Sequence, residues 1–144
     1  FSFSLLILSI LFNNIFTTEI ITNLKINETF ESKKFKISFE GIEQKNKKNF
    51  KAIIGKFTIE NSNGSIDVMK PELRIYNQPN IVTSEADIKT NILMDKFMTM
   101  NLVQNQEYFN VRYQIKPFMI WIWFSVLLMC FSGLISFIKK RNEN

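Results

Sequence analysis

Apolar and polar residues alternate with a period of two through the middle of the chain. The clearest alternating runs are Phe35–Phe39, Phe57–Ile59, Met98–Leu102 and Phe109–Ile115. Because successive side chains of a strand point to opposite faces, this alternation predicts strands with one buried face. We therefore expect residues 17–117 to form a small, mostly antiparallel β-domain.

Glycine and asparagine divide the alternating runs. Residues 61–64 read Asn-Ser-Asn-Gly and lie between two runs. An Asn-Gly pair in this position is typical of a β-hairpin turn. Gly41 follows the run that begins at Phe35, and we expect that strand to end there.

Proline brackets a further short segment. Pro71 and Pro79 stand on either side of Leu73–Tyr76. Because proline cannot donate a hydrogen bond to a central ladder, we expect this segment at a sheet edge. The next stretch, Ser84–Asn91, fits a short helix with a serine as its N-cap.

A long uncharged stretch follows the last alternating run. Residues 118–138 carry no charge, and as a helix they would extend about 32 Å, enough to cross a hydrocarbon core of about 30 Å. Trp121 and Trp123 suit the aromatic belt at one end. The basic residues at the other end suit the cytoplasmic side; they are Lys139, Lys140 and Arg141. The sequence thus predicts a transmembrane helix over 118–138 and a basic tail, 139–144, in the cytoplasm or the mitochondrial matrix.

The first stretch, residues 1–16, is also apolar apart from serines and asparagines. It has no basic start of the kind that a secretory signal carries. We interpret it as the end of a truncated transmembrane helix; the alternative is a signal segment removed from a secreted-type domain with a tail anchor. The predicted fold class is therefore a membrane protein whose small β-domain lies on the outer side, periplasmic or intermembrane-space, between two transmembrane helices.

Composition limits the chemistry. The 144 residues include no histidine and one cysteine, and the formal net charge is +5. Without histidine the chain lacks the commonest general base, metal ligand and haem ligand. The basic tail supplies three of the charges, so the charge does not indicate nucleic-acid binding. Cys130 lies inside the apolar stretch, and Met98 and Met100 fall on an apolar strand face where they predict core packing. We expect no catalytic residue and no metal site.

The segment Pro71–Tyr76 carries the most suggestive polar pattern. Glu72, Arg74 and Tyr76 alternate, so they project from one face of a strand. One interpretation is a cross-strand ion pair with a ring packed over it. The other is a docking surface for a partner or for an anionic group such as a carboxylate.

Four motifs in order resemble a known family. They are Pro71–Tyr76 (PELRIY), Thr83–Ile88 (TSEADI), Arg112–Phe118 (RYQIKPF) and Trp121–Trp123 (WIW). Their order and spacing resemble the C-terminal end of the cytochrome c-type biogenesis protein CcmF family, and the resemblance covers nearly the whole chain.

The resemblance implies part of a haem lyase, which attaches haem covalently to the Cys-x-x-Cys-His of apocytochrome c in the bacterial or mitochondrial inner membrane. The implied partners are apocytochrome c, an apocytochrome-handling subunit and a haem chaperone. In such proteins haem is bound by parts upstream of this stretch, and Lys70 stands where the family leads us to expect a histidine. We therefore expect an enzymatic role only through the complex, and a structural or docking role for this piece.

The residues that this interpretation assigns to docking are Pro71, Glu72, Arg74, Tyr76, Glu85, Arg112 and Lys116. An alternative remains: a membrane-anchored β-domain that serves as an adaptor or structural subunit of another inner-membrane complex. Upstream genomic sequence and co-purified partners would distinguish the two.

Overall fold

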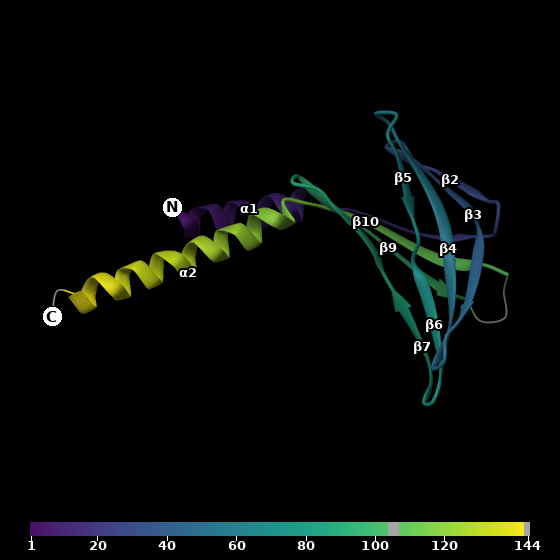
Figure 1. The fold of residues 1–144 in the computed structure, drawn as a ribbon. Coiled ribbons are helices and arrows are strands. Elements are labelled where there is room, and N and C mark those ends of the chain that lie inside the picture. The colour runs from purple at the N-terminus through teal and green to yellow at the C-terminus, as the bar shows by residue number, and fades with distance from the viewer. Residues whose placement is uncertain (104–106, 143–144) are drawn as a thin grey trace. The chain divides into compact units, whose positions relative to one another are not determined.

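The computed structural model describes residues 1–103 and 107–142, and for residues 136–142 it describes the backbone only (Figure 1). The elements in chain order are α1 (Ser2–Phe16), β1 (Thr18–Leu24), β2 (Thr29–Glu31), β3 (Phe35–Asn46), β4 (Phe50–Asn61), β5 (Ile66–Met69), β6 (Glu72–Asn77), β7 (Asn80–Glu85), β8 (Asp87–Thr90), β9 (Met94–Leu102), β10 (Phe109–Pro117) and α2 (Met119–Asn142).

The chain divides into two compact units. The helical unit comprises residues 1–18, 90–95 and 115–144, and the sandwich unit comprises residues 19–89 and 96–114.

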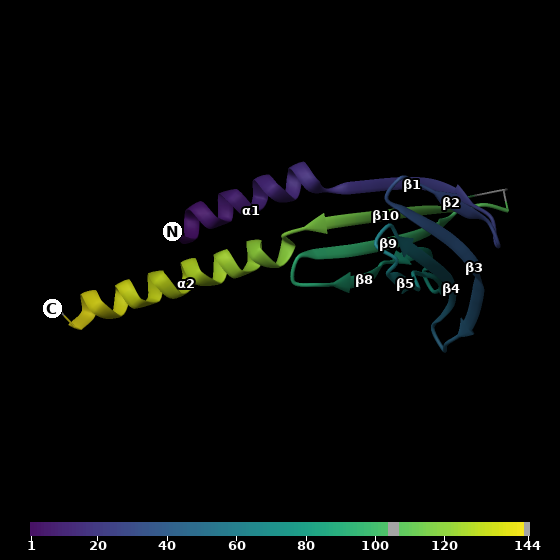
Figure 2. The ribbon, with the colours of Figure 1, turned by 90° about the horizontal axis from the view of Figure 1, so that it is seen from above.

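The sandwich unit is built from two sheets. One has the strand order β1-β10-β9-β8, and the other has the order β2-β3-β4-β6-β7 with β5 paired to β4. Figure 2 shows β1, β10 and β9 running side by side as one layer. The pairs β2–β3, β3–β4, β4–β5, β4–β6 and β6–β7 are all antiparallel, which confirms the predicted mostly antiparallel β-domain.

The core lies between the two sheets and uses the apolar positions of the period-two pattern. Its members with at most 2% exposure include Ile37, Phe39, Phe57, Ile59, Met69, Leu73, Met98, Met100, Val111 and Tyr113. The rings of Phe39 and Phe57 stack at 4.4 Å, and Phe109 meets Phe39 edge-on at 5.4 Å. The prediction that Met98 and Met100 pack in the core is confirmed, since both are fully buried.

The Asn-Gly hairpin is confirmed, whereas the strand end at Gly41 was wrong. Asn61 N–H donates to Ser65 O at 2.9 Å, and Gly64 adopts a φ of 79° that suits glycine. Strand β3 instead continues past Gly41 to Asn46, with a shift of register between Phe39 and Gly41. A β-bulge at that point accommodates one extra residue, so the strand continues past the glycine.

Two other expectations were wrong. Strand β6 lies between β4 and β7 rather than at a sheet edge. Pro71 and Pro79 fall just outside its bounds, so neither removes a donor from its ladder. The stretch Ser84–Asn91 forms no helix: it holds the end of β7 and all of β8, and the Ser84 hydroxyl donates to Met100 O at 2.7 Å instead of capping a helix.

The helical unit contains α1 and α2. Asn13 Nδ2 donates to Pro117 O at 2.7 Å, and the rings of Phe12 and Phe118 lie 5.5 Å apart. The hydroxyl of Ser9 donates to the carbonyl four residues earlier in its helix. Ser125 does the same, so neither buried hydroxyl lacks a partner.

Among the described residues, no helix is both long enough and apolar enough to span a membrane. The predicted spans over 1–16 and 118–138 are therefore not confirmed and stay predictions.

Candidate functional site

The predicted docking residues of β6 meet those of two neighbouring strands on one face of the six-stranded sheet. Strand register places Tyr76 opposite Phe50 on β4. It also places Glu72 opposite Glu85 on β7. Residues directly opposite in an antiparallel pair share a face. We call this set, Phe50, Glu72, Arg74, Tyr76 and Glu85, the Arg74 face.

Arg74 is the centre of the Arg74 face. Its Nη2 lies 3.2 Å from Glu72 Oε2, and its Nη1 lies 3.6 Å from Glu85 Oε1. The guanidinium carbon lies 5.2 Å from the centre of the Phe50 ring, and that ring lies 5.2 Å from the ring of Tyr76. One cation is thus held by two carboxylates and covered by an aromatic pair.

The side chains of the Arg74 face are half-buried: Arg74 is 31% exposed, Glu72 33% and Glu85 47%. Interaction with the Tyr76 hydroxyl, followed by the hydrogen bond to Glu72, raises the pKa of Arg74. The guanidinium therefore stays charged at any physiological pH. Its geometry matches the cross-strand ion pair with a ring packed over it, and docking stays a prediction.

The other predicted docking residues are not part of this face. Pro71 is fully buried. Arg112 lies on β10, in the other sheet, where its Nε is 2.6 Å from Glu19 Oε1. Lys116 lies near the end of β10 and belongs to the helical unit. The sequence motifs led us to group these residues in one docking surface. In the fold, Pro71, Arg112 and Lys116 lie apart from the Arg74 face.

The predicted membrane-interface anchors begin with the first turns of α2. Trp123 is 65% exposed, whereas Trp121 is half-buried and its Nε1 has no hydrogen-bond partner among the described residues. The side chains of Lys139, Lys140 and Arg141 lie outside the described residues, so their anchor role stays a prediction.

Sequence reasoning missed Phe50. Strand β4 has apolar residues on both of its faces here, because Phe50, Ala52 and Ile54 alternate with Lys51 and Ile53. The period-two signal is therefore lost. The turn before Phe50 contains no glycine or proline that would mark a hairpin.

Sequence reasoning also missed a polar cluster between the two sheets. Lys96 Nζ lies 2.5 Å from Asp67 Oδ2, and Asn61 Nδ2 donates to the same oxygen at 3.2 Å. Lys89 Nζ adds a longer contact of 3.8 Å to the other oxygen. The hydrogen bond from Lys96 leads these contacts in lowering the pKa of Asp67, although partial burial opposes them.

Tyr113 lies near this cluster but makes no hydrogen bond to it. It is 1% exposed, and its hydroxyl has no hydrogen-bond partner within the part of the chain that the structure describes. Burial, and then the charge of Asp67, raise the pKa of Tyr113, so the phenol stays neutral. The cluster therefore joins the two sheets through the Lys96–Asp67 ion pair, and it does not pair a nucleophile with a base.

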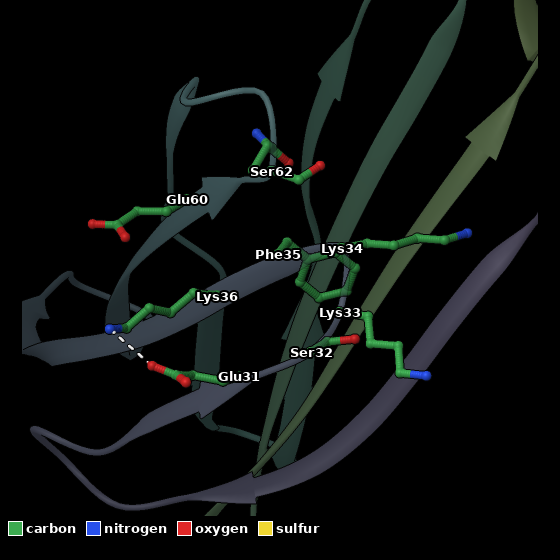
Figure 3. Close-up of a pocket in the computed structure, with 9 residues that line it drawn as sticks. Glu31, Ser32, Lys33, Lys34, Phe35, Lys36, Glu60 and Ser62 are labelled. Atoms are coloured by element: carbon green, nitrogen blue, oxygen red, sulfur yellow. Dashed lines mark ion pairs between the residues drawn. The ribbon is translucent and has the colours of Figure 1, made fainter.

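A hollow of about 330 Å³ lies at the turn between β2 and β3. Figure 3 shows the residues that line it. Phe35 forms part of its wall, whereas Lys33 and Lys34 extend away from the ion pair between Lys36 and Glu31. That pair joins atoms 3.0 Å apart and is well exposed. Its charged side chains Lys33, Lys34 and Glu60 are exposed, so among the described residues the hollow offers no buried polar group for a ligand.

The residues present do not fit a haem ligand set. Histidine is absent from the sequence, and the core methionines Met98 and Met100 are fully buried. Cys130 stands by itself on α2. Among the described residues there is no group of three or more metal-ligating side chains.

Comparison with known proteins gives one consistent result. The family described as CcmF C-terminal beta-sandwich matches residues 15–117. The cytochrome c-type biogenesis protein ccl1 of Rhodobacter capsulatus is 30% identical over 117 residues, which are 81% of this chain and 18% of the relative. The CcmF protein of Pseudomonas fluorescens is 30% identical over 103 residues, or 72% of this chain and 16% of the relative.

A solved structure agrees with these relatives. The cytochrome c heme lyase CcmF superposes with a TM-score of 0.72 at 18% identity, over 93% of this chain and 22% of that one. This likeness shows the fold. The chain spans roughly a fifth or less of the length of the two curated relatives, 18% and 16%.

Proposed function

The chain belongs to the family of CcmF C-terminal β-sandwich domains, and on this basis we propose that it serves cytochrome c maturation as the C-terminal part of a haem lyase. Its own contribution is to support the complex and to dock a partner, and haem is bound by other parts of that complex. The partners of this proposal are apocytochrome c, an apocytochrome-handling subunit and a haem chaperone.

The Arg74 face is the observation that supports docking. Its guanidinium is held in place by Glu72 and Glu85 before any partner arrives, so little side-chain entropy is lost on binding. Arginine and tyrosine are the residue types that most often dominate protein interfaces. Phe50 adds an apolar surface beside the charge. Because Glu72 and Glu85 already neutralise the guanidinium, a partner that sets an apolar side chain against the rings of Phe50 and Tyr76 fits this face.

Replacing Arg74 by alanine tests the proposal. In cells whose cytochrome c maturation depends on this chain, Arg74→Ala is expected to lower covalent haem attachment about five-fold or more. Haem staining of separated cytochrome c gives the measurement, and immunoblotting of membranes gives the amount of the chain. The matched control is Lys36→Ala, which removes an exposed ion pair from the outer face of the same sheet.

The two variants separate docking from structure. Loss of haem attachment with Arg74→Ala alone, at an unchanged level of the chain, supports docking. A fall in the level of the chain, or equal effects of both variants, would show that the Arg74 face is an ordinary structural ion pair.

We further propose that α1 and α2 lie in the bacterial or mitochondrial inner membrane, with the C-terminus in the cytoplasm or matrix. In support, both helices expose many large apolar side chains, among them Phe3, Leu11, Phe16, Phe131 and Ile135. Cysteine labelling checks this in a Cys130→Ser background. A membrane-impermeant maleimide should label Asn63→Cys from outside, and should label Asn144→Cys only after permeabilisation. The reverse labelling pattern would invert the proposed topology.

A further inference from the structure

An apolar pocket of about 400 Å³ lies between the two sheets of the sandwich unit. Its lining comprises Ile53, Leu73, Ile75 and Val82 from the six-stranded sheet and Asn101 and Leu102 from β9. Leu73 is 2% exposed, whereas Val82 is 58% and Leu102 54% exposed. The pocket therefore has a buried apolar wall and an open rim.

The position of the pocket follows from how β7 meets the other sheet. The Ser84 hydroxyl donates to Met100 O at 2.7 Å and fixes β7 to β9 at that point. The chain then passes at Ala86 from the six-stranded sheet into β8 of the other sheet. The exposed rim of the pocket is formed by Val82, which precedes Ser84 on β7, and by Leu102, which follows Met100 on β9.

The pocket lies beside an exposed sheet edge. Among the described residues, strand β7 is the last strand of the six-stranded sheet and pairs with β6 on one side only. Such an edge presents backbone N–H and C=O groups to any chain that approaches in an extended conformation. Its side chains Ile81 and Val82 are 49% and 58% exposed. In strand addition, backbone pairing supplies affinity and pockets for alternate side chains supply specificity.

Lysines surround this end of the sandwich. Lys51 is the register partner of Ile75 and so shares the face that lines the pocket. The hairpin between β3 and β4 also carries Lys45, Lys47 and Lys48, and no acidic residue occurs between Glu43 and Lys56. Asn77 N–H donates to Asn49 O at 3.4 Å, which brings this hairpin beside the turn between β6 and β7.

From these observations we propose that the β7 edge and its pocket bind an extended peptide segment of a partner protein. The segment adds a strand to β7, places an apolar side chain in the pocket and directs an acidic residue toward Lys51. This site lies on the opposite face of β6 and β7 from the Arg74 face, so the two proposals stand independently.

Peptide binding to the purified full chain in detergent tests the site. The probe is a fluorescein-labelled octapeptide of alternating valine and threonine with two glutamates at one end. One control peptide has proline at two threonine positions, and another has lysine for glutamate. Fluorescence anisotropy should show saturable binding of the probe, with affinity about ten-fold weaker for either control peptide.

A pair of variants on one strand localises the binding. Val82→Lys fills the rim of the pocket, whereas Ile81→Lys is similarly exposed but projects from the opposite face of β7. We expect Val82→Lys to weaken binding about ten-fold and Ile81→Lys less than about two-fold. Should Val82→Lys fail to fold by circular dichroism, Leu102→Lys repeats the test from the other sheet. Lys51→Glu should reverse the preference between the glutamate and lysine peptides.

Other results would overturn the proposal. No saturable binding, equal binding of the proline peptide, or equal effects of Val82→Lys and Ile81→Lys would each do so. A concentration-dependent dimer in sedimentation that Val82→Lys abolishes would assign the edge to a second copy of the chain instead.

Discussion

Lys96 and Asp67 form an ion pair between the two sheets of the sandwich, with 2.5 Å between Nζ and Oδ2 and side-chain exposures of 10% and 22%. Asp67 lies on β5 opposite Ile59, which is fully buried, so its carboxylate shares the inner face of its sheet. Lys96 reaches it from β9. The pair therefore couples the position of β5 to that of the opposite sheet.

Asp67→Asn is expected to destabilise the sandwich unit by about 1–3 kcal/mol at pH 7. The variant leaves the Lys96 ammonium partly buried without its counter-charge, and the partial exposure of Asp67 reduces the cost below that of a fully buried pair. Urea unfolding followed by circular dichroism measures the change. Glu31→Gln, which removes an exposed pair, is the control and should change stability much less than Asp67→Asn does.

The stabilisation that Asp67 contributes should also depend on pH. Because the pKa of Asp67 is lowered in the folded state, its stabilisation is complete above the unfolded pKa of about 3.9 and is lost as pH falls through the folded pKa. The stability gap between the original chain and Asp67→Asn should stay constant from about pH 7 to 5 and close below about pH 4. A gap that closes at higher pH would mean that another group controls the pair.

Tyr113→Phe is expected to leave stability unchanged or to raise it by about 1 kcal/mol. The hydroxyl is buried without a described partner, so its removal relieves a desolvation cost while the ring keeps its contact with Phe35. Thermal unfolding monitored by circular dichroism provides the comparison. A loss of more than about 1 kcal/mol would show that the hydroxyl makes a hydrogen bond in solution.

Gly55→Ala is expected to destabilise the sandwich by about 1–3 kcal/mol, through overpacking. A Cβ at residue 55 would lie 2.6 Å from Phe57 Cε2 and 2.7 Å from Met100 Sδ. Gly41→Ala is the matched control, because a Cβ at Gly41 meets no atom within 4 Å. Equal effects of the two substitutions would contradict the packing argument.

The sequence predicted the β-domain because its strands bury one face. Alternation of Phe35, Ile37 and Phe39 marks such a strand, and these residues are indeed core. The pattern failed where both faces are apolar, as at Ile53 and Ile54 on β4. It also could not reveal that β3 continues through Gly41, since the bulge depends on pairing with β4.

The candidate site was predictable only in part. Strand periodicity placed Glu72, Arg74 and Tyr76 on one face, and the structure agrees. Phe50 and Asp67 could not be assigned to their partners from sequence, because cross-strand and cross-sheet neighbours depend on register. From sequence, Lys96 would likewise be taken for a solvated lysine, because its partner Asp67 lies on the opposite sheet.

Arg112→Ala tests whether Arg112, another predicted docking residue, binds a partner or has a structural role. Arg112 is 50% exposed, and its pair with Glu19, 35% exposed, is of a kind that contributes less than about 1 kcal/mol to stability. We therefore expect the variant to unfold within about 1 kcal/mol of the original chain in urea, with Glu19→Gln as the control that removes the same pair from the other side. If Arg112 docks a partner, Arg112→Ala lowers covalent haem attachment to apocytochrome c and Glu19→Gln leaves it unchanged. Equal haem attachment in both variants, at equal levels of the chain, would remove Arg112 from the docking surface.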